Sequence, residues 1–229
     1  MKLNQRLLTV ARFVPKNSTV VDIGTDHALL PIYLIQNNIA FHVIAGDVNF
    51  GPLESARRNI KSAGLEKSID LRLGNGLDII EAGEAEICII AGMGGGTIRD
   101  IMRGAGDKAR IISQFILQPM GGSGSLRQWL AENGWQISDE AIISEEERIY
   151  EVIVATPGKE TTVDAVLISI GPRLFEKKHP LLKKIIIEEI KQNRDILSSL
   201  ERTESVGAVA KREALTHRNF ALERVLECL

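Results

Sequence analysis

The sequence predicts an α/β domain built on a parallel sheet, followed by a helical C-terminal region. Short apolar runs rich in β-branched residues alternate with segments of helical spacing through the first 157 residues. Several of these runs end in an acidic residue or a glycine-rich loop. Beyond residue 157 the strand signals stop, and leucine and isoleucine recur at helical spacing. A chain of 229 residues has room for one such domain and an appendage.

Composition places the chain among soluble globular proteins, since 44% of its residues are hydrophobic and 25% are charged. We expect a cytoplasmic protein without a membrane span, because no apolar run reaches the length that a bilayer requires. The two cysteines, Cys88 and Cys228, are too far apart in sequence to indicate a disulfide framework. The net charge of −2 argues against a generally basic surface, although 13 basic and 11 acidic residues occur from Lys159 onward.

The first elements are a helix and a nucleotide-binding turn. Apolar residues at helical spacing predict a helix over 3–14, and its basic residues, Arg6 among them, either face solvent or contact nucleic acid. A β-branched run at 19–21 predicts a buried strand that ends at Asp22, where Gly24 permits a sharp turn. The helix that follows is expected to take its cap from one of three polar residues, namely Thr25, Asp26 or His27.

The second strand, 41–47, ends in Asp47, which lies about one βαβ unit after Asp22. Its carboxylate is therefore expected at the same edge of the sheet, where it can accept hydrogen bonds from both hydroxyls of a ribose. A helix over 52–63 is predicted to end at Gly64. The third strand, 69–73, leads into a loop with Asn75 and Gly76, at which an adenine ring could stack.

The fourth strand, 87–92, is apolar throughout, as a central strand buried on both faces should be. It opens into the glycine-rich loop 91–96, whose bare backbone would let a flat ring approach and a carbonyl accept from an exocyclic amine. A simple turn is the alternative. A fifth strand at 115–119, a helix at 125–133 and three alternating segments at 135–138, 140–143 and 150–155 complete the sheet. The last two segments are expected to form an antiparallel hairpin.

The stretch 157–159, Pro-Gly-Lys, marks the predicted boundary between a catalytic domain, 1–157, and a helical domain, 158–229. One amphipathic helix is predicted over 181–200. A second is predicted over 206–229, with a seven-residue step through Leu215, Leu222 and Leu229. Joined near 205–207, the two form an αα-hairpin. The apolar face of the second helix is expected to hold Val206, Val209, Leu215, Phe220, Leu222, Leu226 and Leu229.

Charge decides between the two cofactor classes that use such a turn. A dinucleotide presents a pyrophosphate and needs bare glycine backbone at a helix N-terminus. Here Asp26 stands two residues after Gly24, and its carboxylate would repel a pyrophosphate. S-adenosylmethionine carries no phosphate, and both its sulfonium and its ammonium are cationic. The turn therefore favours S-adenosylmethionine, while an NAD-dependent enzyme remains an alternative.

At these residues the sequence resembles the bacterial tRNA adenine-N1-methyltransferases that modify position 22. The matching stretches are VDIGTDHALLP at 21–31, GDVN at 46–49, LGNGL at 73–77, AGMGG at 91–95 and LQPM at 117–120. The resemblance implies a class I methyltransferase fold with a seven-stranded Rossmann-like sheet, a C-terminal coiled-coil-like domain, S-adenosylmethionine as donor and tRNA as substrate. The chain departs from generic methyltransferases at Asp26, where they carry Gly, and at 92–95, where many carry Asn/Asp-Pro-Pro-aromatic.

These inferences give the predicted site. Asp26 would stabilise the positive charge that methylation creates on the base, the Met93–Gly94 backbone would hold the N6 amine, and His27 would position the base or merely cap the helix. The predicted cofactor-binding residues are Asp22, Gly24, Thr25, His27, Asp47, Val48, Asn75, Gly76, Ala91, Gly92 and Met93. The predicted tRNA contacts are Lys177, Lys178, Lys183, Lys184 and Arg212.

We expect a monomer without a metal ion. Two other functions stay open on the same fold. One is a methyltransferase of another RNA, a protein or a small molecule, and the other is a non-catalytic module that binds the cofactor and docks a partner.

Overall fold

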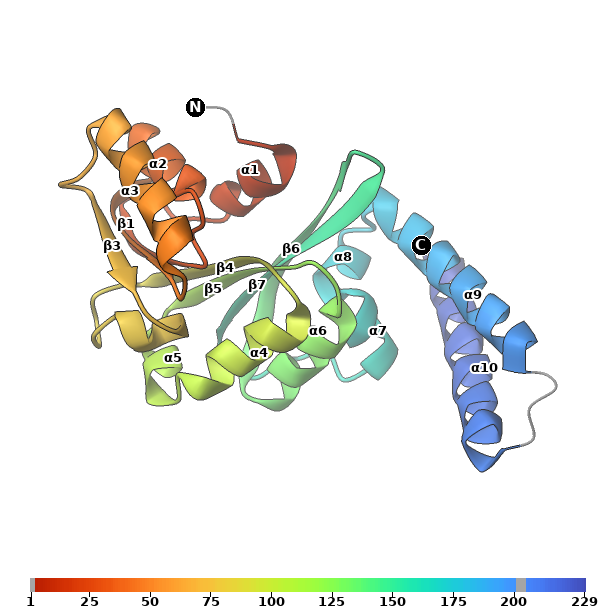
Figure 1. The fold of residues 1–229 in the computed structure, drawn as a ribbon. Helices are drawn as coiled ribbons and strands as arrows, with labels where there is room; N and C mark the ends of the chain where they lie inside the picture. Colours follow the sequence, from red (N-terminus) through yellow and green to blue (C-terminus); the bar gives the residue numbers. More distant parts are fainter. Residues whose placement is uncertain (1–2, 201–204) are drawn as a thin grey trace. The chain divides into compact units, whose positions relative to one another are not determined.

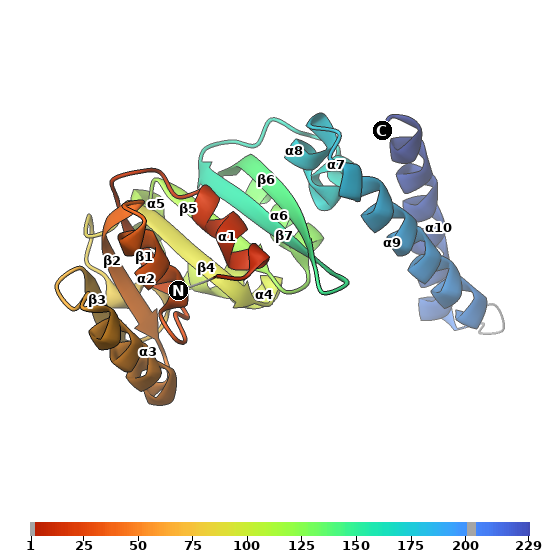
Figure 2. The same ribbon diagram turned by 90° about the horizontal axis from the view of Figure 1, so that it is seen from above.

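The computed structural model describes residues 3–200 and 205–229 of the chain (Figures 1 and 2). These divide into two compact units, Met1–Thr161 and Thr162–Leu229. The sequence placed this boundary slightly earlier, at residue 157.

The first unit is built on one seven-stranded sheet, as the resemblance implied (Figure 1). Its order, β3-β2-β1-β4-β5-β7-β6, places β1 and β4 side by side at its centre. The five strands from β3 to β5 are parallel, and β7 runs antiparallel to both of its neighbours. The strands are β1 (Ser18–Ile23), β2 (Ala40–Asp47), β3 (Ile69–Leu73), β4 (Ile87–Met93), β5 (Gln114–Pro119), β6 (Trp135–Glu145) and β7 (Arg148–Pro157).

Helices cover both faces of this sheet (Figures 1 and 2). One face carries α1 (Gln5–Arg12), α2 (Leu29–Gln36) and α3 (Phe50–Ala63). The other carries α4 (Gly95–Gly104), α5 (Asp107–Ile111) and α6 (Ser123–Glu132). Gly64 ends α3 in the left-handed conformation at φ 68°, as predicted. The short α5 and the 3₁₀ turn η1 (Gly76–Ile79) were not predicted, because each is too short to show a periodic pattern.

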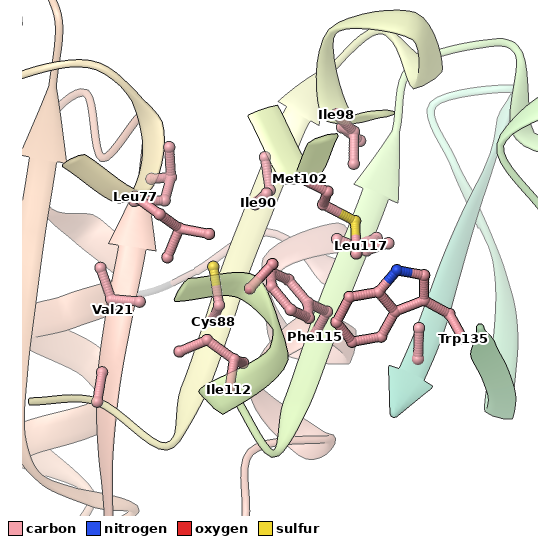
Figure 3. Packing of buried hydrophobic residues seen from close by; sticks show 14 of the residues in the cluster. Val21, Leu77, Cys88, Ile90, Ile98, Met102, Ile112, Phe115, Leu117 and Trp135 are labelled. Carbon is pink, nitrogen blue, oxygen red and sulfur yellow. The ribbon is translucent and has the colours of Figure 1, made fainter. Parts of the chain in front are cut away.

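Two hydrophobic clusters, one on each face, hold the layers together. Figure 3 shows the cluster under α4 and α6, where Cys88, Phe115 and Trp135 are fully or almost fully buried. The rings of Phe115 and Trp135 meet edge to face, with centroids 5.2 Å apart. Central strands thus contribute apolar side chains to both clusters, which explains the uninterrupted apolar run of β4.

The segments 135–138 and 140–143 are one strand rather than two. β6 runs unbroken from Trp135 to Glu145 and pairs with β7 along its whole length, with a register shift between Ile137 and Asp139. That irregularity interrupts the alternation in the sequence and explains the wrong prediction.

A buried ionic cluster joins α6 to β6 and β7. The Arg127 guanidinium of α6, which is 1% exposed, contacts the carboxylates of Glu140 on β6 and Glu151 on β7.

The second unit consists of α7 (Ala165–Ile170), α8 (Pro172–Glu176), α9 (Pro180–Leu200) and α10 (Val206–Glu227). α9 and α10 form the predicted antiparallel hairpin (Figure 1). Residues 201–204 between them lie outside the described residues, and Ser205 caps α10. The short α7 and α8 were not predicted. The apolar face assigned to the second helix was partly wrong, because Val206 is 87% and Phe220 63% exposed.

Polar contacts join the helices of the second unit. Asn193 and Asn219 are both buried between α9 and α10, and the Asn193 amide donates to Asn219 Oδ1 at 2.8 Å. The Arg218 guanidinium contacts Glu189 on α9 at 2.7 Å and donates to the Ser169 hydroxyl on α7. A buried amide pair satisfies its own hydrogen bonds only when the two residues face each other, so it fixes the alignment of the two helices.

Candidate active site

The site lies at the carboxyl ends of β1 and β4, where the strand order of the sheet reverses. Ligands of open α/β sheets bind at such a point. Gly24 leaves β1 at φ 77°, and a Cβ there would lie 2.3 Å from the methyl carbon of Met93. Only glycine fits this turn without a shift of Met93. Main-chain hydrogen bonds from Gly24 and Thr25 to the carbonyl of Gly46 tie the turn to β2.

The loop after Gly24 is strained. Asp26 and Ala28 adopt left-handed backbone conformations, with φ of 48° and 55°, which non-glycine residues seldom occupy. Ala28 stands at the start of α2, and no side chain caps that helix. The predicted cap by Thr25, Asp26 or His27 is therefore wrong. The side chains of Asp26 and His27 are 66% and 52% exposed, and His27 Nε2 lies 3.6 Å from Asp26 Oδ2.

Asn59 of α3 supports this loop, and sequence reasoning missed it. Its side-chain amide donates to the carbonyl of His27 at 2.9 Å. The two residues are 32 positions apart, so no local pattern could reveal the contact. This hydrogen bond ties the strained loop to α3.

A cavity of about 330 Å³ opens beside this loop. It brings together residues from the turn after β1, from the end of β4 and from α1. Asp22 and Asp26 lie in its wall together with Arg6, whereas the sequence offered Arg6 only as a surface or nucleic-acid contact. The residues that line the cavity are Asn4, Arg6, Leu7, Asp22, Gly24, Thr25, Asp26, His27, Leu29, Leu30, Ala91 and Gly92.

Asp22 is the buried acid of this cavity. Asp22 is 5% exposed, and burial raises the pKa of its carboxyl to about 6, although the Thr25 hydroxyl lowers that pKa in part and the negative charge of Asp47 adds a smaller increase. The neighbouring Thr25 hydroxyl oxygen is also buried. It interacts with Asp22, but no group in the described part of the chain meets ordinary hydrogen-bond geometry with it. Two polar groups are therefore held in the wall of a cavity without full satisfaction, which is typical of groups that await a ligand.

The loop after β4 is joined to the end of β5. Gly92 has φ of 79°, and its N–H donates to the Gln118 side-chain oxygen at 3.1 Å. The Met93 carbonyl accepts from Met120 N–H at 2.8 Å, and the Gly94 carbonyl accepts from Ile98 N–H at 3.0 Å. The two carbonyls predicted to hold the N6 amine thus each accept one hydrogen bond and keep a second lone pair. Gly92 is the glycine of this loop that lines the cavity together with Asp26.

The other predicted cofactor residues lie outside this first cavity. Asn75 and Gly76 line a second cavity of about 360 Å³, which α4 closes on its other side. Asp47 ends β2, and its Oδ1 accepts from Asn49 N–H at 2.8 Å. Val48, next to it, is 57% exposed. These four residues lie at or just after the carboxyl ends of β2 and β3, on the same edge of the sheet as Gly24. Met93, which is also outside the first cavity, ends β4.

The predicted tRNA contacts fall in the second unit and behave differently from one another. Lys177, Lys178, Lys183 and Lys184 are exposed. Arg212 is half-buried and donates to the carbonyl of Leu200, near the end of α9. Its guanidinium therefore stabilises the hairpin, and the four lysines are the better candidates for phosphate contacts.

Comparison with known proteins decides the family. The family model described as tRNA (adenine(22)-N(1))-methyltransferase, TrmK, matches residues 20–223. The chain belongs to the TrmK family. The resemblance noted in the sequence motifs is thereby confirmed. The TrmK match spans both units and includes every stretch of the candidate site except the residues of α1.

Individual TrmK relatives agree along the whole chain. A Bacillus subtilis protein named tRNA (adenine(22)-N(1))-methyltransferase is 36% identical over 207 residues, which are 88% of this chain and 87% of the relative. A Streptococcus pneumoniae protein described as a putative tRNA (m1A22) methyltransferase, solved with S-adenosyl-L-methionine, is 32% identical with a TM-score of 0.87, covering 98% of this chain and 100% of that one. TrmK of M. capricolum, solved with S-adenosylhomocysteine, is 28% identical with a TM-score of 0.88, covering 100% and 99%.

No group of three His, Cys, Asp or Glu side chains in the described ranges, 3–200 and 205–229, is arranged to hold a metal ion. Within the same ranges, no helix combines the length and the apolar character that crossing a membrane requires.

Proposed function

We propose that this protein transfers a methyl group from S-adenosylmethionine to N1 of adenine 22 in tRNA. The observation that carries the proposal is the cavity at the ends of β1 and β4, in which two carboxylates, Asp22 and Asp26, flank the glycine turn. Carboxylates there suit a cationic methyl donor and repel a pyrophosphate. Membership of the TrmK family supports the choice of substrate.

The residues of the cavity fit this cofactor. Gly24 leaves space for a ligand to approach the main chain, and the buried Asp22 carboxyl and Thr25 hydroxyl have hydrogen-bonding capacity to spare. Asp47, whose Oδ2 accepts no hydrogen bond within the described residues, can receive ribose hydroxyls, and the second cavity with Asn75 suits an adenine. When bound, S-adenosylmethionine supplies an electrophilic methyl group on a positively charged sulfur.

The chain's own residues have a limited chemical task. Adenine N1 has a free lone pair, so no general base is needed. Asp26 places a negative charge at the cavity mouth, where it stabilises the positive charge that appears on the base. The Met93–Gly94 backbone would hold the N6 amine, and Gly92 offers bare main chain beside it to the edge of the ring. Asn59 and the left-handed backbone at Asp26 hold that carboxylate in position.

Recognition of tRNA falls to the second unit in this proposal. N1 lies on the Watson–Crick edge, so adenine 22 must be unpaired or turned out of the stack before it reaches the cavity. Lys177, Lys178, Lys183 and Lys184 would contact phosphates. Replacing all four lysines with glutamine should weaken tRNA binding several-fold, flatten its salt dependence and leave cofactor binding unchanged. An unchanged salt dependence would count against this assignment.

The decisive experiment is nucleoside mass spectrometry of tRNA incubated with the protein and S-adenosylmethionine. We expect 1-methyladenosine at position 22, and none in a tRNA with guanine at that position. Asp26→Ala should lower kcat about ten- to a hundredfold with little change in the Kd for S-adenosylmethionine. Loss of cofactor binding would instead assign Asp26 to the cofactor site, and methylation at another atom would refute the proposed reaction.

We also propose that the protein is a monomer and that it acts on tRNA in the cytoplasm. Size-exclusion chromatography with light scattering should give a mass near 25.2 kDa, the mass of one chain. A doubled mass would contradict this expectation.

A further inference from the structure

Arg6 stands out among the residues of the first cavity. It projects from α1, and within the described part of the chain it is the one Lys or Arg side chain in the cavity wall. The same wall carries Asp22 and Asp26. A single fixed cation among acidic groups indicates that the cavity receives a ligand with charges of both signs.

The Arg6 side chain is held in place rather than free in solvent. Its Nη1 donates to the side-chain oxygen of Gln118, which is fully buried and also accepts from Gly92 N–H. The guanidinium carbon lies 5.8 Å from the centre of the Tyr150 ring. A Cβ at Gly92 would lie 3.6 Å from Nη1, so the guanidinium reaches the glycine loop at the end of β4.

The charge of Arg6 is not neutralised by the chain. No carboxylate in residues 3–200 and 205–229 forms an ion pair with it, and the bond to Gln118 is the one hydrogen bond that its guanidinium makes there. A guanidinium has five N–H donors, so most of its capacity is open. A planar, preorganised donor set of this kind matches a carboxylate.

We propose that Arg6 binds the carboxylate of the methionine end of S-adenosylmethionine. The inference rests on the proposed function and deepens it. The methionine end carries an ammonium, a sulfonium and a carboxylate. The buried Asp22 carboxylate complements the cationic groups, and Arg6 complements the anion. A tRNA phosphate is the other anion available, but it carries no cation beside its negative charge, so the buried Asp22 and the nearby Asp26 would repel it from this cavity.

Isothermal titration calorimetry on the full chain tests the assignment with two ligands. One is S-adenosylmethionine, and the other is its decarboxylated analogue, which keeps the sulfonium and the amine. The wild-type protein should bind the analogue about 10- to 100-fold more weakly, the range expected for a charge-assisted hydrogen-bonded pair. Arg6→Gln should remove most of this preference by weakening S-adenosylmethionine alone. Arg6→Lys should retain part of it. Arg12→Gln, an exposed arginine on the same helix, is the matched control.

Each outcome has a definite meaning. Equal affinity of the wild-type protein for both ligands would overturn the assignment, and so would an Arg6→Gln variant that loses both ligands equally, because that is a structural effect. An Arg6→Gln variant with normal cofactor affinity and a raised KM for tRNA would assign Arg6 to a phosphate. If the wild-type protein binds neither ligand, the proposed function itself fails. The wild-type comparison needs no variant and is unaffected by misfolding.

Discussion

Replacing Asp22 with asparagine should stabilise the protein at neutral pH while weakening its cofactor binding. The Asp22 pKa is raised from 3.8 to about 6, so the native state holds this proton more tightly than the unfolded chain does. Stability from this group is then fully present below pH 4 and is lost as the pH rises through 6. A shift of about two units corresponds to about 3 kcal/mol of destabilisation at pH 8.

Asparagine keeps the shape of the side chain and removes the charge. Because its buried amide must also find partners, the net gain at pH 8 should be about 1–3 kcal/mol, with little difference from wild type at pH 4. For a unit of this size that is a rise in Tm of about 2–12 °C.

Urea unfolding at a series of pH values, followed by tryptophan fluorescence, measures this directly. Both tryptophans, Trp129 and Trp135, lie in the first unit, so the signal reports the unfolding of the unit that contains Asp22. The quantity to compare is the difference in unfolding free energy between variant and wild type, which cancels the titration of other carboxyls. Asp107→Asn, an exposed change on α5, controls for the loss of one negative charge. A difference that does not grow between pH 4 and pH 7 would refute the reasoning.

Three further outcomes are expected. Gly24→Ala should lower the stability by about 1–3 kcal/mol and weaken S-adenosylmethionine binding, because the new Cβ meets Met93 at 2.3 Å on a left-handed backbone; unchanged melting and cofactor titration would contradict the turn geometry. Asn59→Ala should lower kcat and leave Tm almost unchanged, because it removes the hydrogen bond to the His27 carbonyl at the site; a wild-type kcat would show that Asn59 does not support the site. Arg127→Met should destabilise by about 3–5 kcal/mol in chemical denaturation, because it leaves Glu140 beside Glu151 without a cation, whereas the double variant with Glu140→Gln should recover part of the loss.

The part of the site that the sequence predicted rests on short-range geometry. Parallel strands joined by helices align their carboxyl ends, so Asp22, Gly24, Ala91 and Gly92 had to meet once their strands were recognised. The seven-stranded sheet and the family followed from motifs of the same kind. These predictions needed no knowledge of side-chain packing.

The residues that were missed act across long sequence separations or through backbone strain. Arg6 reaches the site because α1 docks on the sheet, 112 positions away from Gln118 in sequence. A polar side chain was predicted to cap α2, but the helix has no side-chain cap and is preceded by left-handed backbone at 26 and 28. The hydrogen bond from Met120 N–H to the Met93 carbonyl joins the loops after two different strands, so no single segment reveals it.

The amide pair in the α9–α10 hairpin has a consequence for how such a tail tolerates change. Two leucines at positions 193 and 219 would stabilise the contact between the helices more than two asparagines do. They would pack almost as well, however, if the register of one helix were shifted by seven residues. The amides forbid that shift, since a displaced asparagine would sit among aliphatic groups with nothing to bond. The hairpin thus gives up some stability for a single alignment of its helices, and the spacing of its surface lysines depends on two side chains that are almost entirely buried.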